Sequence, residues 1–221
     1  MTTLKQPVHT LFAVVSSAIL CLACTAKTTP FSTHTPPPLV SGILDLKICP
    51  MQVSNKPSHV DGQVNRRYAT GCLNGVDLLV APAPDACLSS GFGRRNGRQH
   101  RGLDFQSRPA GPVIAAASGR VIELGVRPQD FGRWIVLDHD AGVYTAYAHL
   151  NSTSPGLQKG SRVVQGQSLG IMGSSGAATR AVHLHYEVRR GTLPDDISHG
   201  QFFGLEALNP FDLPANCLAS R

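Results

Sequence analysis

Residues 182–188 read VHLHYEV, and this stretch decides the expected fold. Apolar and polar residues alternate along it as they do in a β-strand, whose successive side chains point to opposite faces of a sheet. The apolar members would face a core, and the polar members His183, His185 and Glu187 would share the other face. Two imidazoles about 7 Å apart on one face can bind a metal ion and contact a substrate together. Taken alone, such a pair is more typical of two exposed strand histidines.

Short β-type runs separated by glycine-containing turns surround this stretch. The predicted strands are residues 113–117, 120–126, 134–138, 143–150, 168–172 and 183–189. No stretch of 12 or more residues has convincing helical periodicity. We therefore predict a mainly β fold for residues 88–213, an antiparallel β-sheet domain with little helix. Residues 39–87 form an N-terminal extension that is expected to pack on this domain, with short strands expected at 39–46 and 76–81. Residues 214–221 form a C-terminal tail.

A second candidate site pair lies at His100 and Asp104 in the segment HRGLD. Gly102 is expected to let the chain bend, so that the imidazole and the carboxylate converge on one ion. Neither this pair nor His-x-His is specific alone. Together they supply the two histidines and one carboxylate that suit catalytic zinc, with the fourth position left for water. The helical H-E-x-x-H motif of another zinc class is absent from the sequence.

His149 ends the predicted strand YTAYAHL, residues 144–150. Strand alternation places it on the same face as Thr145 and Tyr147. By itself it is typical of a strand-end histidine near solvent. The other histidines are expected to be solvated or capping residues; they are His9, His34, His59, His139 and His199.

The order of several segments carries more information than any one motif. They are SGFGRRNGRQHRGLDF (90–105), PVIAAASGRVIELG (112–125), GRWIVLDHDAGVYTAYAHL (132–150), LQKGSRVVQGQSLGIMGSSG (157–176) and VHLHYEV. In this order they closely resemble the LytM/lysostaphin-type zinc metallopeptidases, the β-lytic endopeptidases of bacterial cell walls. The resemblance covers roughly residues 88–213.

The resemblance implies one Zn2+ per chain, with His100, Asp104 and His185 as its ligands. It also implies that His149 and His183 are catalytic, one moving the proton of the attacking water and the other stabilising the oxyanion. Glu187 is either a residue that orients a ligand or a surface glutamate. The chain departs from the family pattern at Ala181-Val182, where Gly-Pro is usual, and in an apparent insertion at residues 195–208.

The implied function is zinc-dependent hydrolysis of the peptide cross-links of peptidoglycan. The expected target is a D-alanyl–meso-diaminopimelate bond, with glycine bridges as the alternative. A different class of function is a non-catalytic LytM-type module that binds cell wall or activates a cell-wall amidase, and a regulatory protein partner would suit either. A third reading is a secreted protease that acts on other proteins.

The first residues have the pattern of an export signal. Lys5 precedes an apolar run over residues 11–24, which is too short for a mature membrane span of about 20 residues. We expect residues 1–23 to be a lipoprotein signal and Cys24 to be lipidated, with ordinary signal cleavage as the alternative. Residues 24–38 are Thr/Pro-rich and form a tether. The expected location is the periplasm, with a lipid anchor in the outer membrane.

Composition narrows the range of partners. The 221 residues include 20 Lys+Arg and 14 Asp+Glu, which gives a net charge of +6 and suits an anionic partner such as cell wall. Aromatic residues make up only 6%, and no basic cluster is interleaved with them. We therefore expect no nucleic-acid partner.

Four cysteines follow the signal region: Cys49, Cys72, Cys87 and Cys217. An even number of cysteines in an exported chain favours disulfides. Three pairings are possible. We favour Cys49–Cys72 and Cys87–Cys217, the second of which would tie the start of the main domain to its end.

Overall fold

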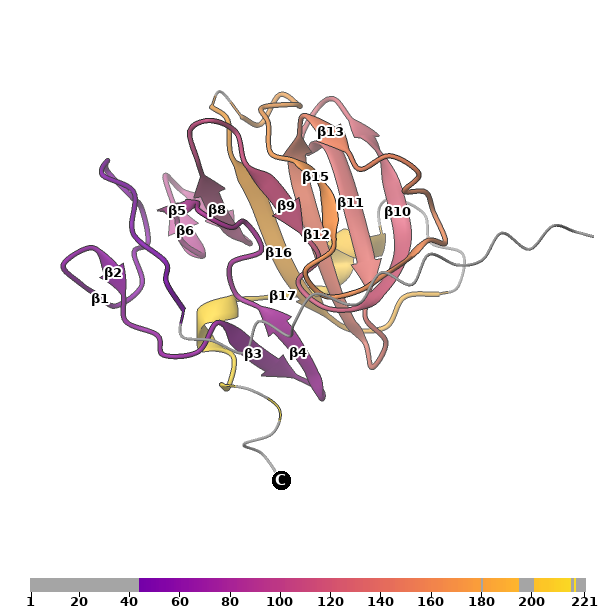
Figure 1. Cartoon of the computed structure of the whole chain (residues 1–221), viewed down its shortest axis with the longest axis horizontal. Coiled ribbons are helices and arrows are strands. Elements are labelled where there is room, and N and C mark those ends of the chain that lie inside the picture. The colour runs from indigo at the N-terminus through magenta and orange to yellow at the C-terminus, as the bar shows by residue number, and fades with distance from the viewer. Residues whose placement is uncertain (1–43, 180, 195–200, 216, 218–221) are drawn as a thin grey trace, which may run out of the picture. The chain divides into compact units, whose positions relative to one another are not determined.

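The computed structural model of the protein describes residues 44–179, 181–194, 201–215 and 217. Across these ranges the chain forms β-strands and two short 3-10 helices and contains no α-helix (Figure 1). The predicted mainly β, antiparallel fold is therefore confirmed. None of the helices in this part of the chain is long and apolar enough to cross a membrane. The predicted signal, the tether and Cys24 lie outside the described residues, as do His9, His34 and His199.

An eight-stranded antiparallel sheet forms the centre of the domain. Its order is β14-β10-β11-β12-β16-β8-β5, and β17 also pairs with β16. The strands are β5 (Cys87–Ser90), β8 (Leu103–Gln106), β10 (Gly119–Arg127), β11 (Gly132–Asp138), β12 (Val143–Leu150), β14 (Arg162–Val163), β16 (Leu184–Arg190) and β17 (Glu206–Leu208).

One face of this sheet carries the main hydrophobic core. A three-stranded sheet in the order β13-β15-β9 contributes to this core and consists of β13 (Ser152–Thr153), β15 (Ser168–Ile171) and β9 (Pro112–Ile114). Tyr147 of β12 and Tyr186 of β16 are fully buried in it. The Tyr147 hydroxyl accepts a hydrogen bond from the Ala116 amide at 2.8 Å. Tyr147 is thus a core residue.

The opposite face carries a smaller aromatic cluster around Trp134 of β11 and Phe202. Phe202 belongs to the 3-10 helix η1 (Gln201–Gly204), which lies behind the sheet in Figure 1. The segment expected as an insertion therefore covers this second face with η1 and extends the sheet with β17. Its residues 195–200 lie outside the described residues.

Three small hairpins lie outside the main sheet: β1 (His59–Val60) with β2 (Gln63–Val64), β3 (Thr70–Leu73) with β4 (Val76–Leu79), and β6 (Gly93–Arg95) with β7 (Arg98–His100). The strand expected at 76–81 is present as β4. Residues 44–46 of the strand expected at 39–46 are not a strand. Leu44 and Leu46 are nevertheless buried in the main core, as expected for an extension that packs on the domain.

The disulfides correct the favoured pairing. Cys49 bonds to Cys87, and Cys72 bonds to Cys217. Cys49 lies beside β5 because its amide donates to the Leu88 carbonyl at 3.0 Å, which places Cys87 within reach. Cys72 lies beside the chain end because its amide donates to the Pro214 carbonyl at 2.8 Å. The first bridge therefore ties residue 49 to strand β5 of the main sheet, and the second ties β3 to the C-terminal segment; cysteine spacing reports neither contact.

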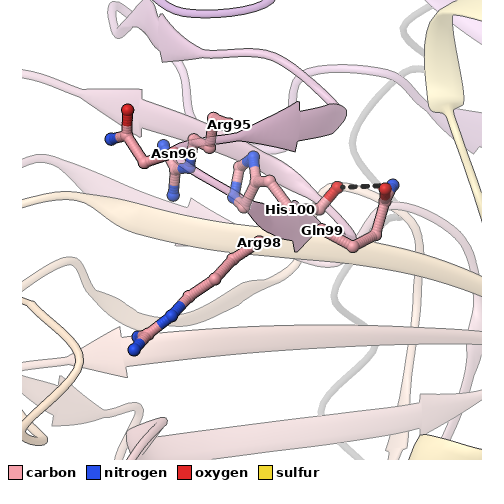
Figure 2. Close-up of a pocket in the computed structure, with 5 residues that line it drawn as sticks. All are labelled: Arg95, Asn96, Arg98, Gln99 and His100. Carbon is pink, nitrogen blue, oxygen red and sulfur yellow. Dashed lines mark hydrogen bonds between the residues drawn. The ribbon is translucent and has the colours of Figure 1, made fainter.

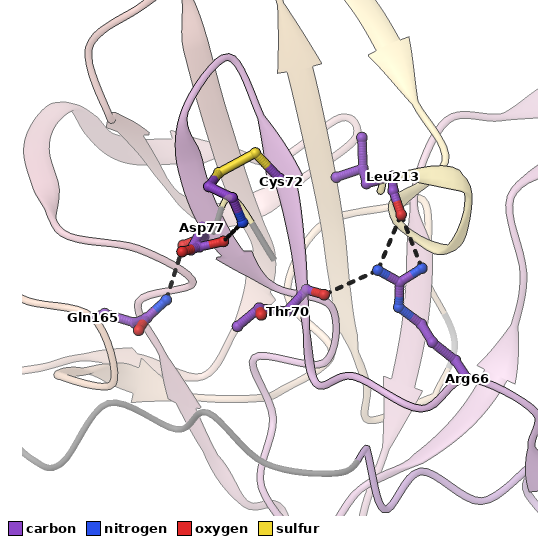
Figure 3. The surroundings of a disulfide bond; sticks show 7 residues. Arg66, Thr70, Cys72, Asp77, Gln165 and Leu213 are labelled. Carbon is purple, nitrogen blue, oxygen red and sulfur yellow. Dashed lines mark hydrogen bonds between the residues drawn. A yellow bond between two sulfur atoms is a disulfide. The ribbon is translucent and has the colours of Figure 1, made fainter. Parts of the chain in front are cut away.

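The Cys72–Cys217 bridge lies in a network of polar contacts (Figure 3). Arg66 donates to the carbonyls of Thr70 and Leu213, and the Cys217 amide donates to the Asp77 carboxylate at 2.7 Å. Leu213 follows the second 3-10 helix, η2 (Pro210–Asp212). The extension and the C-terminal segment thus hold each other in place.

Candidate metal centre and active site

Three side chains from separate elements meet in one buried group: His100 at the end of β7, Asp104 in β8 and His185 in β16. His100 Nε2 lies 3.1 Å from both Asp104 Oδ1 and His185 Nδ1. His185 Nδ1 lies 2.9 Å from Asp104 Oδ1. The three atoms form a nearly equilateral triangle, so a single ion can contact all of them.

Pairing of β8 with β16 creates this meeting. His185 and Asp104 are directly opposite each other in the antiparallel register. Their chain neighbours on both strands face the core, so both polar side chains point to the other face. His183, at an isolated bridge to Gly173 just before β16, follows the same alternation. The face predicted from VHLHYEV is therefore confirmed.

Gly102 allows β8 to approach β16 closely. A Cβ at this position would lie 2.3 Å from the Tyr186 carbonyl oxygen and 2.9 Å from Cε1 of His185. The expected role of Gly102 was to let the chain bend. What the structure requires is instead the absence of a side chain beside the His185 ring.

Substituting Gly102→Ala is expected to displace β8 from β16, because backbone cannot yield to a contact of 2.3 Å. We expect a loss of about 1–3 kcal/mol in the free energy of unfolding and weaker metal binding. Denaturant unfolding and metal titration would measure the two effects. Gly204→Ala is the matched control, since a Cβ there meets nothing within 4 Å. Equal behaviour of the two variants would refute this explanation of Gly102.

The outer nitrogens of both imidazoles are already committed to other partners. His100 Nδ1 lies 2.7 Å from the Gly91 carbonyl oxygen, to which it can only donate. His185 Nε2 lies 3.0 Å from Oε1 of Glu187. With these protons on the outside, the inner nitrogens of two neutral imidazoles are acceptors, as is the Asp104 carboxylate. Three buried acceptors about 3 Å apart repel one another unless a cation lies between them.

The pKa of His185 shows that a positive charge is stabilised at this position. Burial lowers the pKa of His185, but hydrogen bonds and charges from Asp104 and Glu187 outweigh burial and raise the pKa to about 9. Burial raises the pKa of Asp104, yet hydrogen bonds from His100 and His185 bring it well below its usual value. A single proton can satisfy the group, and a metal ion must displace that proton.

The second oxygen of Asp104 is held separately. Oδ2 lies 3.1 Å from Nη2 of Arg95, whose other terminal nitrogen donates to the Ser90 hydroxyl. Arg95 therefore fixes the carboxylate so that Oδ1 alone faces the two histidines.

Glu187 is a buried partner of the ligand group and not a surface residue. Its Oε1 contacts His185, and its Oε2 accepts a hydrogen bond from Arg189 Nε at 2.7 Å. Arg189 is also buried and donates to the carbonyls of Phe203 and Leu205 at 3.2 and 2.9 Å. A continuous polar chain thus runs from the segment that contains η1 to His185.

His149 does not share a face with Tyr147, contrary to the expectation from alternation. Its ring lies 4.8 Å from that of His183 and 6.0 Å from that of His185, centroid to centroid, on the face opposite the core. The cause is local: His149 has a φ of 63°, so the strand alternation breaks there. The break turns the imidazole toward the group of His100, Asp104 and His185.

His149 and His183 are oriented in the same way. His149 Nδ1 lies 2.9 Å from the Ser175 carbonyl oxygen, and His183 Nδ1 lies 2.9 Å from the Ala181 carbonyl oxygen. Each Nδ1 therefore carries the proton, and each Nε2 is an unprotonated acceptor. His183 Nε2 lies 3.7 Å from Asp104 Oδ1.

Both imidazoles are kept neutral. Burial, supported by the neighbouring histidines, lowers the pKa of His149 to about 4. Burial also lowers the pKa of His183. The two side chains can therefore accept a proton at neutral pH. Phe131 packs against both His149 and His185, with ring centroids 6.3 and 5.4 Å away, and shields this side of the group.

The remaining candidates lie elsewhere. His59 is exposed, as expected. His139 is buried, contrary to expectation, because its ring nitrogens bond to the Ser118 carbonyl and the Thr145 hydroxyl. Cys72, Asp77 and Cys217 also form a compact group, but the two cysteines are joined in a disulfide and cannot ligate a metal as thiolates.

An antiparallel β domain that brings a His/Asp/His group together with two neutral imidazoles has the parts of a metallopeptidase. Residues 98–197 match the family described as Peptidase family M23. The matched segment holds the candidate site, and it is similar to the M23 peptidases, the LytM/lysostaphin-type family.

Two curated relatives illustrate the range of similarity. The DD-carboxypeptidase/endopeptidase Mpg of Neisseria meningitidis is 38% identical over 116 residues, which make up 50% of this chain and 26% of that protein. The outer membrane antigenic lipoprotein B of Haemophilus influenzae is 34% identical over 143 residues, 62% of this chain and 34% of that protein. The chain thus spans about a third or less of the length of these relatives.

A solved structure supports the fold alone. The structure of the SpoIIQ-SpoIIIAH pore forming complex includes a chain that is 20% identical to this one, with a TM-score of 0.50. The match covers 63% of this chain and 92% of that chain.

Proposed function

We propose that this protein is a zinc-dependent endopeptidase that hydrolyses peptide cross-links of bacterial peptidoglycan. The observation that carries the proposal is the buried triangle of His100, Asp104 and His185, whose inward atoms all become acceptors once both imidazoles are neutral. Without an ion, a proton between His185 and Asp104 can satisfy the group, and a bound zinc ion would displace that proton.

The donor set fits zinc. Zinc bonds of about 2.0–2.2 Å place neighbouring ligand atoms about 3.3 Å apart in a tetrahedron, close to the 2.9–3.1 Å observed here. Three protein ligands leave one position for water or substrate. A zinc ion bound there supplies a Lewis acid and lowers the pKa of water to about 7. Glu187 holds the Nδ1 lone pair of His185 inward by accepting the proton on Nε2.

His149 and His183 supply the proton transfers. Each presents an unprotonated Nε2 while a backbone carbonyl holds its Nδ1–H. One of them accepts the proton of the attacking water and delivers it to the leaving amine. The other, beside it, can stabilise the charge that develops on the substrate oxygen once its Nε2 has taken up a proton, because only a protonated Nε2 can donate to that oxygen. Their low pKa values keep both in the form that accepts a proton at neutral pH.

The similarity to M23 peptidases and the two disulfides support the proposed substrate and location. The two disulfides suit an oxidising compartment, and several relatives carry the word lipoprotein in their names. We place the protein in the periplasm, attached to the outer membrane by lipid on Cys24, where peptidoglycan is the available substrate. A regulatory protein partner is compatible with this role.

Removal and restoration of the metal test the proposal. Treatment with a chelator is expected to abolish release of soluble fragments from purified peptidoglycan, and one equivalent of zinc per chain is expected to restore it. Cleavage that continues after complete metal removal would contradict a metal-dependent mechanism. Full zinc occupancy with no cleavage would instead favour the non-catalytic cell-wall module.

A further inference from the structure

The hairpin of β6 and β7 presents an unusual concentration of positive charge beside the metal-binding group. Residues 93–100 read GRRNGRQH, and the turn at Asn96-Gly97 has positive φ at both residues, 49° and 74°, as tight two-residue hairpins require. The register places Arg95 directly opposite Arg98. Like charges directly opposite on neighbouring strands destabilise a hairpin. We therefore expect this arginine pair to have a function that offsets the unfavourable charge repulsion.

A pocket lies on this hairpin (Figure 2). It is lined by Arg95, Asn96, Arg98, Gln99 and His100, which include no acidic residue. His100 belongs to the metal-binding group, so the pocket adjoins the reaction centre. His100 and Arg98 are two residues apart on β7, so their side chains lie on the same face of the hairpin.

The two arginines differ in what they already bind. Arg95 is committed to Asp104 and Ser90. Figure 2 shows Arg95 near the His100 ring, while the Arg98 side chain extends away from the hairpin. Arg98 is exposed, and its guanidinium forms no hydrogen bond or ion pair with any residue in the described ranges. It is free to bind an anion, and Asn96 adds an amide donor to the same pocket.

The candidate substrates differ in one chemical group, which is attached to the carbon that carries the leaving amine. This group is a charged carboxylate in some of them and a neutral amide in others. In a D-alanyl–meso-diaminopimelate cross-link, the carbon that carries the leaving amine also carries a free carboxylate. A D-alanyl–D-alanine terminus has the same group at the same place. In the interior of a glycine bridge, that position is an uncharged amide carbonyl.

We propose that the pocket beside His100 binds the carboxylate on the carbon that carries the leaving amine, with Arg98 as its charged anchor. This inference rests on the proposed peptidase function and deepens it. Guanidinium is suited to this role because its planar fork matches a carboxylate in a bidentate arrangement. The pocket would therefore select cross-links and termini that carry the carboxylate and disfavour glycine bridges.

Binding measured without turnover tests the pocket directly. The probes are a synthetic peptide that ends in D-alanyl-D-alanine and its C-terminal carboxamide. They are titrated calorimetrically into the zinc-loaded whole chain that carries His149→Ala. We expect the acid to bind at least about tenfold more tightly than the amide. Adding Arg98→Gln should remove this preference. Arg162→Gln should preserve the preference, because Arg162 lies in β14, the edge strand of the main sheet farthest in strand order from β8 and β5.

Equal binding of acid and amide, or a preference that survives Arg98→Gln, would overturn the inference. Turnover separates this outcome from failure of the proposed function. With the unsubstituted chain, Arg98→Gln should raise KM for the carboxylate substrate about tenfold and lower kcat much less. If the unsubstituted chain cleaves neither peptidoglycan nor either peptide, the peptidase function is wrong. If it cleaves acid and amide equally well, only the pocket assignment is wrong.

Discussion

Replacing His185 with alanine is expected to abolish both zinc retention and peptidoglycan cleavage. The substitution removes one of three ligand atoms and also leaves Glu187 without its imidazole partner. Removing a residue that only orients a ligand weakens metal binding roughly 10–100-fold. Removing a ligand itself should weaken zinc binding by more than that. Cleavage should fall below about a thousandth of the original rate, since the activated water is lost with the metal. Zinc content after dialysis and fragment release would be measured on the same samples.

Folding must be monitored alongside this variant. His59→Ala is the matched control, because His59 is exposed and lies in the small β1–β2 hairpin outside the main sheet. It should retain zinc, activity and unfolding midpoint. A His185→Ala protein that keeps stoichiometric zinc would remove His185 from the ligand set.

His149→Ala and His183→Ala are expected to retain zinc and lose turnover. Neither residue belongs to the triangle of acceptor atoms, yet both rings lie beside it. General acid–base catalysis contributes about 10²- to 10⁴-fold to rate, and an oxyanion donor about 10²- to 10³-fold. Each substitution should therefore lower kcat by at least about a hundredfold. The rate of fragment release at saturating substrate and the zinc content would be measured together.

The outcome for His183 also tests the division of roles within His-x-His. Nδ1 of His185 lies 2.9 Å from Asp104 Oδ1, whereas Nε2 of His183 lies 3.7 Å from the same atom. If His183→Ala loses the metal and His185→Ala keeps it, the roles assigned to these two histidines are reversed.

Alternation along VHLHYEV was sufficient to predict the site face of β16. Tyr186 faces the core and His185 faces Asp104, because an uninterrupted strand obeys a period of two. The same rule failed at His149, whose positive φ breaks the period. A histidine with positive φ has no sequence signature of its own, so the orientation of this ring could not be predicted from alternation.

Other features depended on contacts between distant segments. The disulfide partners are 38 and 145 residues apart in sequence, and the packing of the N-terminal extension determines them. The buried position of Glu187 depends on Arg189, which the carbonyls of Phe203 in η1 and of Leu205 just after η1 hold in place. By contrast, the β6–β7 hairpin carried a usable signal, since Asn-Gly between two short runs is typical of a two-residue turn.

Digestion of purified peptidoglycan most directly tests the assignment as a zinc endopeptidase. The protein and its His149→Ala variant would be compared at equal zinc content, with products identified by mass spectrometry. The proposed mechanism predicts new monomeric muropeptides from the unsubstituted protein alone, with masses that identify the bond cleaved. The absence of such products despite bound zinc, or equal product from both proteins, would contradict it.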